Sequence, residues 1–367
     1  MATDVDALSH STLFWRSFSH FIGGMGVLVF VLALTPRSHA SSYQMMKAEV
    51  PCPLFGKLAS KLTDTARILY LIYIGLSLIL FIFLLFGGMS VFDALCHTFG
   101  TAGTGGFGIY SDSVAHYSSS YLHIVLTIGM IVFGINFNLY YLLLMCHVKD
   151  FFHDEELRWY LGIILLAIFL IAGNVWHLYD NVFYLCRDVS FTVASIITTT
   201  RFTTANYDLW PMFSHIILLL LIIIGGCAGS TAGGLKVSRV VVNLKIAKNE
   251  LIRKLQPGRI LVTKINKDPF PAKEQRGLHA YMIAYLLIFV VLLLFVSREA
   301  GDFSSAFSSV CATFNNVGPG LYRVGPTGNF FHYSQPVKFL LSLGMIAGRL
   351  EIWPILILFS AHTWRKN

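Results

Sequence analysis

Threonine, asparagine and glycine residues gather in three short stretches whose backbone and hydroxyl oxygens could replace water around a metal cation. They read TAGTGGFG at 101–108, TTTRFTTANYD at 198–208 and FNNVGPG at 314–320. Glycine adopts positive φ readily and can turn a carbonyl toward an axis, and rings of carbonyls dehydrate cations in membrane pores. Arg201, inside the second stretch, adds a permanent positive charge, because a guanidinium stays protonated. The three stretches therefore predict an ion path with an unusual fixed charge.

Each stretch closes an apolar run that is too short to cross a membrane, at 91–107, 188–203 and 303–320. A spanning helix needs about 20 apolar residues for a hydrocarbon core of about 30 Å. Longer apolar runs flank the short ones and predict seven spans, at 13–35, 66–87, 121–147, 157–176, 212–243, 278–298 and 335–363. Non-helical backbone is tolerated at membrane depth only where it lines a cavity or is buried in protein. The short runs are thus expected to be re-entrant.

The composition predicts an all-α integral membrane protein. Hydrophobic residues make up 55% of the 367-residue chain and charged residues 13%, whereas ordinary globular domains carry about 25% charged residues. The six cysteines are scattered without a CxxC pair, so neither a disulfide framework nor a metal-ligand cluster is indicated. The sequence contains no phosphate-loop, HExxH or GxSxG signature. We therefore expect no enzyme and no organic cofactor.

The basic residues predict the orientation in the membrane. The formal net charge is +8, and the bases concentrate in the loops 36–65 and 236–276, whereas the segment 88–120 contains no Lys or Arg. Basic loops stay on the cytoplasmic side. This places the N-terminus outside and the C-terminus in the cytoplasm, and it argues against a nucleic-acid partner, because the charge lies beside membrane spans.

A unit of span, short helix, turn and span occurs three times, at about 66–147, 157–243 and 278–363. The span 13–35 looks like the closing half of a fourth copy. The predicted organisation is a closing span at 1–35, a cytoplasmic linker at 36–65, repeats at 66–150 and 151–243, a basic linker at 244–276, and a last repeat at 277–367.

Several strings resemble the bacterial potassium transporters TrkH, TrkG and KtrB. Besides the three stretches above, these are WRSF at 15–18, IGGMG at 22–26, GGCAGSTAGGLKVSR at 225–239 and GMIAGRLEIWP at 344–354. The resemblance covers nearly the whole chain and favours the TrkH type. It implies repeated span–re-entrant pore helix–span units arranged pseudo-four-fold around one pore. It also implies K+ uptake across the bacterial inner membrane, a homodimer, and a cytosolic TrkA-type nucleotide-binding ring.

The resemblance also implies which residues hold K+ through backbone carbonyls. In the family each repeat contributes one filter strand with a central glycine, and this position falls on Gly105, Arg201 and Gly318. The implied filter comprises Ala102, Gly103, Thr104, Gly105, Gly106, Thr199, Thr200, Arg201, Phe202, Asn316, Val317, Gly318 and Pro319.

The glycine-rich string of the fifth span is expected to interrupt its helix, because each interior glycine costs about 1 kcal/mol. The resemblance implies an intramembrane loop that gates the pore, with Arg349 pointing into the pore near it. The implied gate comprises Gly225, Gly226, Ala228, Gly229, Ser230, Thr231, Gly233, Gly234, Lys236 and Arg349. Close helix packing for the small residues and a snorkelling role for Arg349 are the alternatives.

Two departures from the family pattern bear on conduction. Arg201 replaces a filter glycine and would repel a nearby cation, unless its side chain extends outward toward Asp208 or the strand rotates Thr200 or Thr203 to the axis. The pattern also leads us to expect about one hundred further residues before Met1. The alternative function is therefore a truncated, non-conducting scaffold. Selectivity for K+ over Na+, and channel-like flow against coupled symport, are open at this point.

Overall fold

The computed structural model describes residues 5–24, 26, 62–259, 261–266, 268–326, 328–350 and 352–358, with the backbone alone for 62–65. The described chain is mostly helical with almost no strand, as predicted. Its strands, β1 (Lys264–Ile265) and β2 (Asp268–Pro269), pair antiparallel in one small hairpin. The predicted linker at 36–65 and the C-terminal residues from 359 onward lie almost wholly outside the described residues.

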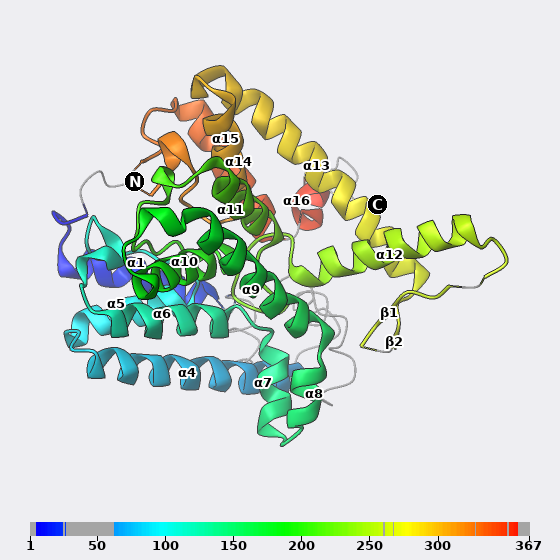
Figure 1. The fold of residues 1–367 in the computed structure, drawn as a ribbon, viewed down its shortest axis with the longest axis horizontal. Coiled ribbons are helices and arrows are strands. Elements are labelled where there is room, and N and C mark those ends of the chain that lie inside the picture. The colour runs from blue at the N-terminus through cyan, green and yellow to red at the C-terminus, as the bar shows by residue number, and fades with distance from the viewer. Residues whose placement is uncertain are drawn as a thin grey trace, which may run out of the picture.

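The helices follow one another in three groups, shown in Figure 1. The first contains α1 (His10–Gly24), α4 (Leu62–Phe86), α5 (Val91–Ala102), α6 (Ser120–Phe133) and α7 (Phe137–Leu144). The second contains α8 (Val148–His153), α9 (Glu155–Val175), α10 (Val182–Ile197), α11 (Met212–Ile224) and α12 (Val237–Leu255). The third contains α13 (Ala272–Ala300), α14 (Phe303–Phe314), α15 (Gln335–Arg349) and α16 (Trp353–Leu358).

Short 3-10 helices stand in the connections, as η1 (Ser113–His116), η2 (Trp176–Leu178), η3 (Tyr207–Leu209) and η4 (Tyr322–Val324). In each group a long apolar helix precedes a short one: α4 before α5, α9 before α10, and α13 before α14. The long and short helix of each pair pack against each other. The short helices correspond to the three predicted re-entrant segments, although α10 begins six residues before the predicted 188.

Three helices of the described chain are long and apolar enough to cross a membrane: Ala66–Phe86, Glu155–Leu178 and Ala272–Ala300. The predicted span at 121–147 is broken, because α6 and α7 meet at an angle of 92°, and the two helices are long and apolar enough to cross a membrane only when taken together. Asn136 causes the break by capping α7, with its side-chain oxygen accepting from the Asn138 N–H at 3.0 Å. The predicted spans 212–243 and 335–363 are likewise interrupted, after Ile224 and after Arg349.

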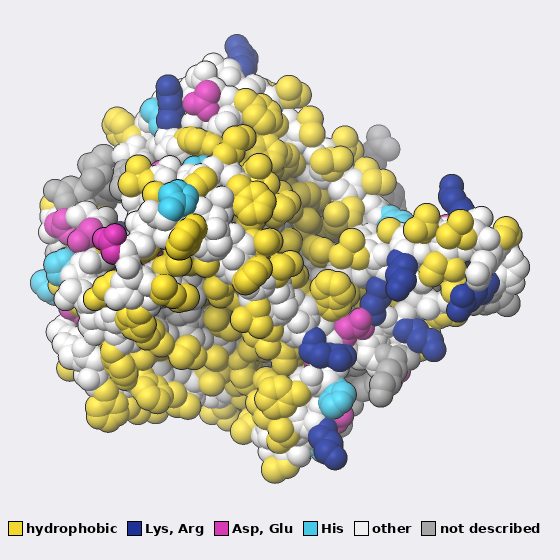
Figure 2. Space-filling view, in the orientation of Figure 1, with side chains coloured by type: hydrophobic (Ala, Val, Ile, Leu, Met, Phe, Trp, Pro, Cys, Tyr) yellow, Lys and Arg dark blue, Asp and Glu magenta, His cyan; other side chains and the backbone are white. Residues whose placement is uncertain are grey.

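The surface separates apolar from basic regions. Hydrophobic side chains cover the broad middle of the molecule, whereas Lys and Arg gather along α12 and near the hairpin at the right-hand end (Figure 2). Exposed apolar residues lie on all three long helices, including Leu71, Phe86, Leu165, Phe169, Leu286 and Leu294. Water would solvate such a surface poorly, so the distribution suits a membrane protein with a polar, basic end outside the hydrocarbon.

Each short helix begins with a side-chain cap. Ser90 accepts from the Asp93 N–H on α5, Asn181 from the Phe183 N–H on α10, and Asp302 from the Ser305 N–H on α14. A cap satisfies one of the backbone N–H groups that the first turn leaves without a helical partner. The caps therefore fix where each short helix turns back into the protein.

We predict that the Asp302→Ala variant lowers the stability of the protein. Asp302 lies in the turn between α13 and α14, and it accepts from both the N–H and the hydroxyl of Ser305, at 2.6 and 2.9 Å. Loss of such a cap costs about 1 kcal/mol. Thermal unfolding in detergent should show a lower Tm for Asp302→Ala than for Asp302→Asn, since asparagine also caps.

The same cap predicts a pH dependence. The hydrogen bond from the Ser305 N–H lowers the pKa of Asp302 below its usual value, so the stabilisation is present above the usual Asp pKa and is lost as the pH falls through the lowered one. The exposed Asp180→Ala is the matched control and should leave the Tm unchanged. Equal melting of the Asn and Ala variants of Asp302 would contradict this account.

Candidate functional site

The three short helices end in turns with the same hydrogen-bond pattern. The N–H groups of Gly105, Thr200 and Val317 donate to the carbonyl oxygens of Gly100, Ser195 and Ala312, each at 2.9 Å. One residue earlier, Thr104, Thr199 and Asn316 donate to Thr101, Ile196 and Thr313, each at 3.1 Å. Segments that differ in sequence thus adopt one local backbone arrangement, in line with the predicted repeat.

Two left-handed positions define each turn. The first is Thr104, Thr199 or Asn316, with φ of 48°, 58° and 58°. The second, two residues on, is Gly106, Arg201 or Gly318, with φ of 55°, 78° and 97°. The residue that corresponds to Arg201 and Gly318 is therefore Gly106, and the predicted register with Gly105 is off by one residue. Sequence alone missed this because three glycines lie within four residues there.

Steric contact explains the glycine at the second position of the first turn. A Cβ atom on Gly106 would lie 1.4 Å from the carbonyl oxygen of Thr200 in the next turn. A Cβ atom on Gly105 would lie 2.0 Å from the Nδ1 atom of His20 on α1. The first turn is therefore packed against the second turn on one side and against α1 on the other, without room for a side chain.

One cavity of ≈ 380 Å³ lies among these turns. Its lining consists of Ser19, His20, Gly23, Gly103, Thr104, Thr199, Arg201, Asn316 and Arg349. Six of these residues were predicted for the filter or the gate. The α1 residues Ser19, His20 and Gly23 were not predicted, and the glycine pair in the string IGGMG is the signal that could have identified them. The structure thus brings all three turns, α1 and the end of α15 to one space.

The remaining predicted filter residues stand beside this lining. Ala102, Phe202 and Val317 are buried, and Phe202 stacks on His97 with ring centroids 5.5 Å apart. The hydroxyl of Thr200 pairs with that of Thr198 at 2.7 Å, so Thr199 and Arg201, which line the cavity, alternate with an inward-packed Thr200. Pro319 follows Gly318 and is partly buried.

The Arg201 side chain lies across the third turn. Its Nη2 atom donates to the carbonyl oxygen of Asn316 at 3.3 Å, and a Cβ atom on Gly318 would lie 2.5 Å from its Cδ and Nε atoms. The guanidinium also stands 5.5 Å from the ring centroid of Phe107. Asp208 instead accepts from the Tyr322 N–H at 3.1 Å. The Arg201 charge therefore faces the cavity, and the alternative in which its side chain extends toward Asp208 is not what the structure shows.

The glycine-rich string forms a loop from Gly225 to Lys236 between α11 and α12, as expected from its glycines. The chain leaves α11 at Gly225, where φ is 72° and a Cβ atom would lie 2.2 Å from the Gly233 carbonyl oxygen. Gly229 and Gly234 also have positive φ, at 72° and 79°, and so does Lys236, at 78°. The Nζ of Lys236 donates to the carbonyl of Ala232 and closes the loop.

This loop is hydrogen-bonded to all three turns. The Thr104 hydroxyl donates to the Thr231 carbonyl at 2.8 Å, and the Gly233 N–H donates to the Thr199 hydroxyl at 2.8 Å. The Gly234 N–H donates to the carbonyl of Asn315 at 3.2 Å.

The loop is also hydrogen-bonded to the bend between α6 and α7. These bonds run from the Cys227 N–H to the Gly134 carbonyl, from the Phe137 N–H to the Gly229 carbonyl, and from the Thr231 hydroxyl to the Phe133 carbonyl. Within the loop, Gly226 accepts from the Val237 N–H, and the Ser230 hydroxyl donates to Cys227.

Arg349 joins the loop to α1. Its Nη1 atom donates to the carbonyl oxygen of Thr231 at 2.9 Å, and its Nη2 atom lies 3.3 Å from the carbonyl oxygens of Gly23 and Gly24. Because Arg349 is the last residue of α15 and lines the cavity, it faces inward. The snorkelling alternative does not fit these contacts.

The cavity lining suits a cation that binds oxygen. It includes Thr104, Thr199 and Asn316, which carry side-chain oxygens as well as backbone carbonyls, while no group of three or more His, Cys, Asp or Glu residues able to hold a metal occurs in the described chain. Backbone and hydroxyl oxygens can replace part of an ion's hydration shell. The two guanidiniums of Arg201 and Arg349 act in the opposite sense and raise the energy of a cation in the same space.

Comparisons with known proteins agree with this geometry. The family model TrkH, described as a cation transport protein, matches residues 1–366. The Trk system potassium uptake protein TrkH of Salmonella typhimurium is 35% identical over 366 residues, which cover 99% of this chain and 75% of that protein. The Escherichia coli protein of the same name is 34% identical with the same coverage, and TrkG of Escherichia coli is 32% identical.

A solved structure has the same fold. The crystal structure of the potassium transporter TrkH from Vibrio parahaemolyticus superimposes with a TM-score of 0.86 at 31% sequence identity, and the match covers 98% of this chain and 75% of that one. The three turns, the loop across them and the inward-facing Arg349 therefore stand on a fold shared with potassium transporters. The chain belongs to the TrkH family of cation transport proteins, and it is a transport protein and not an enzyme.

Proposed function

We propose that this protein is the pore-forming subunit of a Trk-type system that takes up K+ across the plasma membrane. The observation that carries the proposal is the set of three matching turns around one cavity, bridged by a single loop that bonds to all of them. The relatives at 34–35% identity are named potassium uptake proteins. K+ is the transported ion in this proposal and requires no organic cofactor.

The turns serve as filter strands in a pseudo-four-fold pore. Backbone carbonyls at 102–106, 199–202 and 316–319 replace water around the ion, and the left-handed residues at two positions of each turn direct them. In this proposal the repeats keep the bounds expected from the sequence, at 66–150, 151–243 and 277–367, and α1, in the segment 1–35, supplies Ser19, His20 and Gly23 to the cavity lining.

The loop from Gly225 to Lys236 serves as the gate. It lies against the three turns and is held there by Arg349 and Thr104, which share the Thr231 carbonyl as acceptor. Glycines at the loop ends allow its backbone to change direction without steric cost. Opening requires these bonds to break together, so Arg349 stabilises the closed arrangement and adds positive charge to it.

The assembly follows the family resemblance. We propose a homodimer in the bacterial inner membrane, surrounded by lipid and bound on the cytoplasmic side by a TrkA-type nucleotide-binding ring. The basic residues of α12 and the hairpin support a cytoplasmic position for this end of the molecule (Figure 2). The N-terminal residues are then outside and the C-terminal residues inside. Flux assays measure whether K+ flows as in a channel or by symport.

The direct test is growth of a K+-uptake-deficient bacterium that expresses this chain. Growth at low K+ together with 86Rb+ uptake by purified protein in liposomes is the expected result. Protein that is inserted in the membrane and monodisperse in detergent, yet supports neither growth nor 86Rb+ uptake, would overturn the proposal in favour of a non-conducting scaffold.

We predict that the Arg201→Gly variant increases 86Rb+ uptake by at least about tenfold. A fixed charge at 4–6 Å from an ion site costs about 3–4 kcal/mol at an effective dielectric of 20, and glycine accepts the φ of 78° without strain. The measurement is the initial rate of 86Rb+ uptake into liposomes at low ionic strength.

Two further variants at this position separate charge from shape. Arg201→Lys keeps the charge, so its 86Rb+ uptake should be as slow as that of the parent. Arg201→Gln removes the charge, so its uptake rate should be close to that of Arg201→Gly. If all three variants match the parent rate, the electrostatic role given to Arg201 is wrong.

We predict that the Arg349→Ala variant raises 86Rb+ flux in the absence of any cytosolic partner. The variant removes charge-assisted bonds to Thr231, Gly23 and Gly24, and hydrogen bonds of charged groups contribute about 1.5–3 kcal/mol. The loop equilibrium should therefore shift toward opening by roughly 10- to 100-fold.

The matched control is Arg298→Ala, which removes an exposed arginine near the end of α13. It should leave the flux unchanged. Thr104→Ser keeps the hydroxyl that bonds to Thr231 and should also conduct like the parent. A flux for Arg349→Ala no higher than that of Arg298→Ala would show that the loop does not limit conduction.

A further inference from the structure

Three consecutive acidic residues begin α9, and together they contact the hairpin, α12 and the loop between α11 and α12. Asp154 is the N-cap, and Glu155 and Glu156 are the first two helical residues. Negative charge at this end of a helix is favoured by the helix dipole, which explains the acidic residues but not their partners. All three are partly buried. None of them belongs to the cavity lining.

Glu156 reaches the proposed gate loop. Its Oε1 atom accepts from the N–H of Ala228, in the loop, at 2.6 Å, and from the N–H of Ser238, in the first turn of α12, at 3.1 Å. Both N–H groups lack a helical partner because the chain is interrupted between α11 and α12. One carboxylate oxygen thus ties the loop to the helix that follows it.

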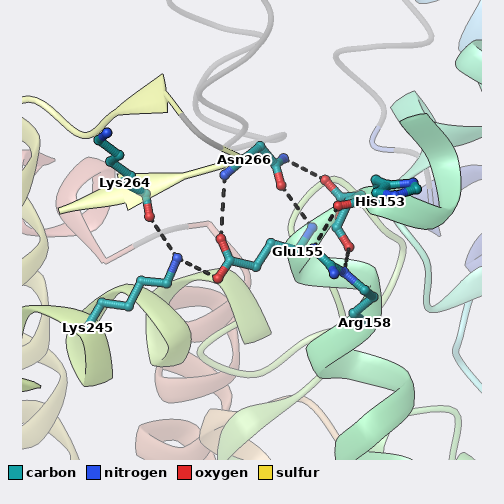
Figure 3. Close-up of polar contacts among 7 residues, drawn as sticks. His153, Glu155, Arg158, Lys245, Lys264 and Asn266 are labelled. Carbon is teal, nitrogen blue, oxygen red and sulfur yellow. Dashed lines mark hydrogen bonds and ion pairs between the residues drawn. The ribbon is translucent and has the colours of Figure 1, made fainter. Parts of the chain in front are cut away.

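Glu155 holds α12 at a second point and holds the hairpin as well. Its Oε1 atom lies 2.5 Å from the Nζ atom of Lys245 on α12. Its N–H donates to the side-chain oxygen of Asn266 at 2.8 Å, and its Oε2 atom lies 3.5 Å from the Asn266 N–H (Figure 3). Asn266 occupies the turn between β1 and β2.

Asp154 and Lys245 complete the attachment of the hairpin. The Oδ2 atom of Asp154 accepts from the Asn266 side-chain amide at 2.7 Å. The Lys245 Nζ atom also donates to the Lys264 carbonyl on β1 at 2.7 Å (Figure 3). The acidic triplet, Lys245 and Asn266 thus form one continuous set of contacts, which we call the clasp.

We propose that the clasp couples the position of α12 and the hairpin to the gate loop, with Glu156 as the positioning residue for the loop. The inference rests on the proposed function, since it assigns the loop as the gate. Within the described chain no hydrogen bond or ion pair joins Lys245 or Asn266 to the loop, so their influence on it must pass through Glu155, Glu156 or α12.

The geometry favours transmission over independent local contacts. Ser238 and Lys245 are seven residues apart on one helix, or about 10 Å along its axis, and both are bound by neighbouring residues of α9. A helix held at two points by a rigid partner cannot turn without breaking one of the two contacts. Release of Lys245 therefore frees α12 to move Ser238 against Glu156 and so loosens Ala228. A cytosolic partner that displaces the hairpin would act through the same contacts.

The test is backbone hydrogen–deuterium exchange of residues 225–238 in the full chain, together with 86Rb+ flux. Glu156→Ala should accelerate exchange at Ala228 and Ser238 by at least about tenfold and raise the flux. Lys245→Ala should accelerate exchange in the same loop by at least about threefold, although Lys245 does not touch it. The combined variant should exchange no faster than Glu156→Ala alone, because both changes act on one pathway.

Arg253→Ala is the matched control, since Arg253 is an exposed cation on the same helix that pairs with the exposed Glu250. It should leave exchange and flux unchanged. Glu156→Gln keeps an acceptor oxygen, so its loop exchange rate should lie between those of the parent and Glu156→Ala. It replaces the alanine variant if that variant does not fold.

The two proposals fail in different ways. If Lys245→Ala and Arg253→Ala give the same loop exchange as the parent, or if the Glu156 and Lys245 effects simply add, the coupling is overturned whatever the flux. If the parent chain carries no 86Rb+, the proposed function is overturned, while accelerated loop exchange in Lys245→Ala would still support the clasp as a mechanical link.

Discussion

Backbone groups that leave a helix inside an apolar body must find hydrogen-bond partners there, because each unpaired group costs several kcal/mol. Here the interrupted segments satisfy one another. The loop between α11 and α12 gives its N–H groups to Thr199 and Asn315, and its Thr231 carbonyl accepts from Thr104 and Arg349. The same bonds that make irregular backbone tolerable also tie the proposed gate to the proposed filter, so the two cannot change independently.

This mutual satisfaction requires close approach and explains where glycine is needed. At Gly106 a side chain would meet the Thr200 carbonyl, and at Gly225 it would meet the Gly233 carbonyl. Arg201 is the exception, since it takes the same left-handed backbone and lays its side chain over Gly318. This position therefore requires the left-handed backbone but accepts a side chain. The Arg201 side chain then brings a positive charge close to the path proposed for the ion.

The sequence located the segments that surround the cavity, and two details that it missed have different physical reasons. Apolar run lengths located the short helices, and clustered glycines located the interruption after Ile224. The bend between α6 and α7 was missed, because Gly134 and Asn136 stand inside a long and mostly apolar run, and the capping bond of Asn136 reveals the break. The register of the first turn was displaced by one residue, because adjacent glycines are indistinguishable until hydrogen bonds select one of them.

By itself the sequence predicted the helical membrane class, the three short helices, the interruption of the fifth span and the place of Arg201 in the turn after the second short helix, because length, hydropathy and glycine placement are local properties. Only the tertiary structure decided that Arg349 and Thr104 share one carbonyl, that His20 borders the cavity, and that Glu156 holds Ala228 and Ser238. Such pairings join segments far apart in the chain. They depend on how the helices pack, and the periodicity of the sequence does not encode that packing.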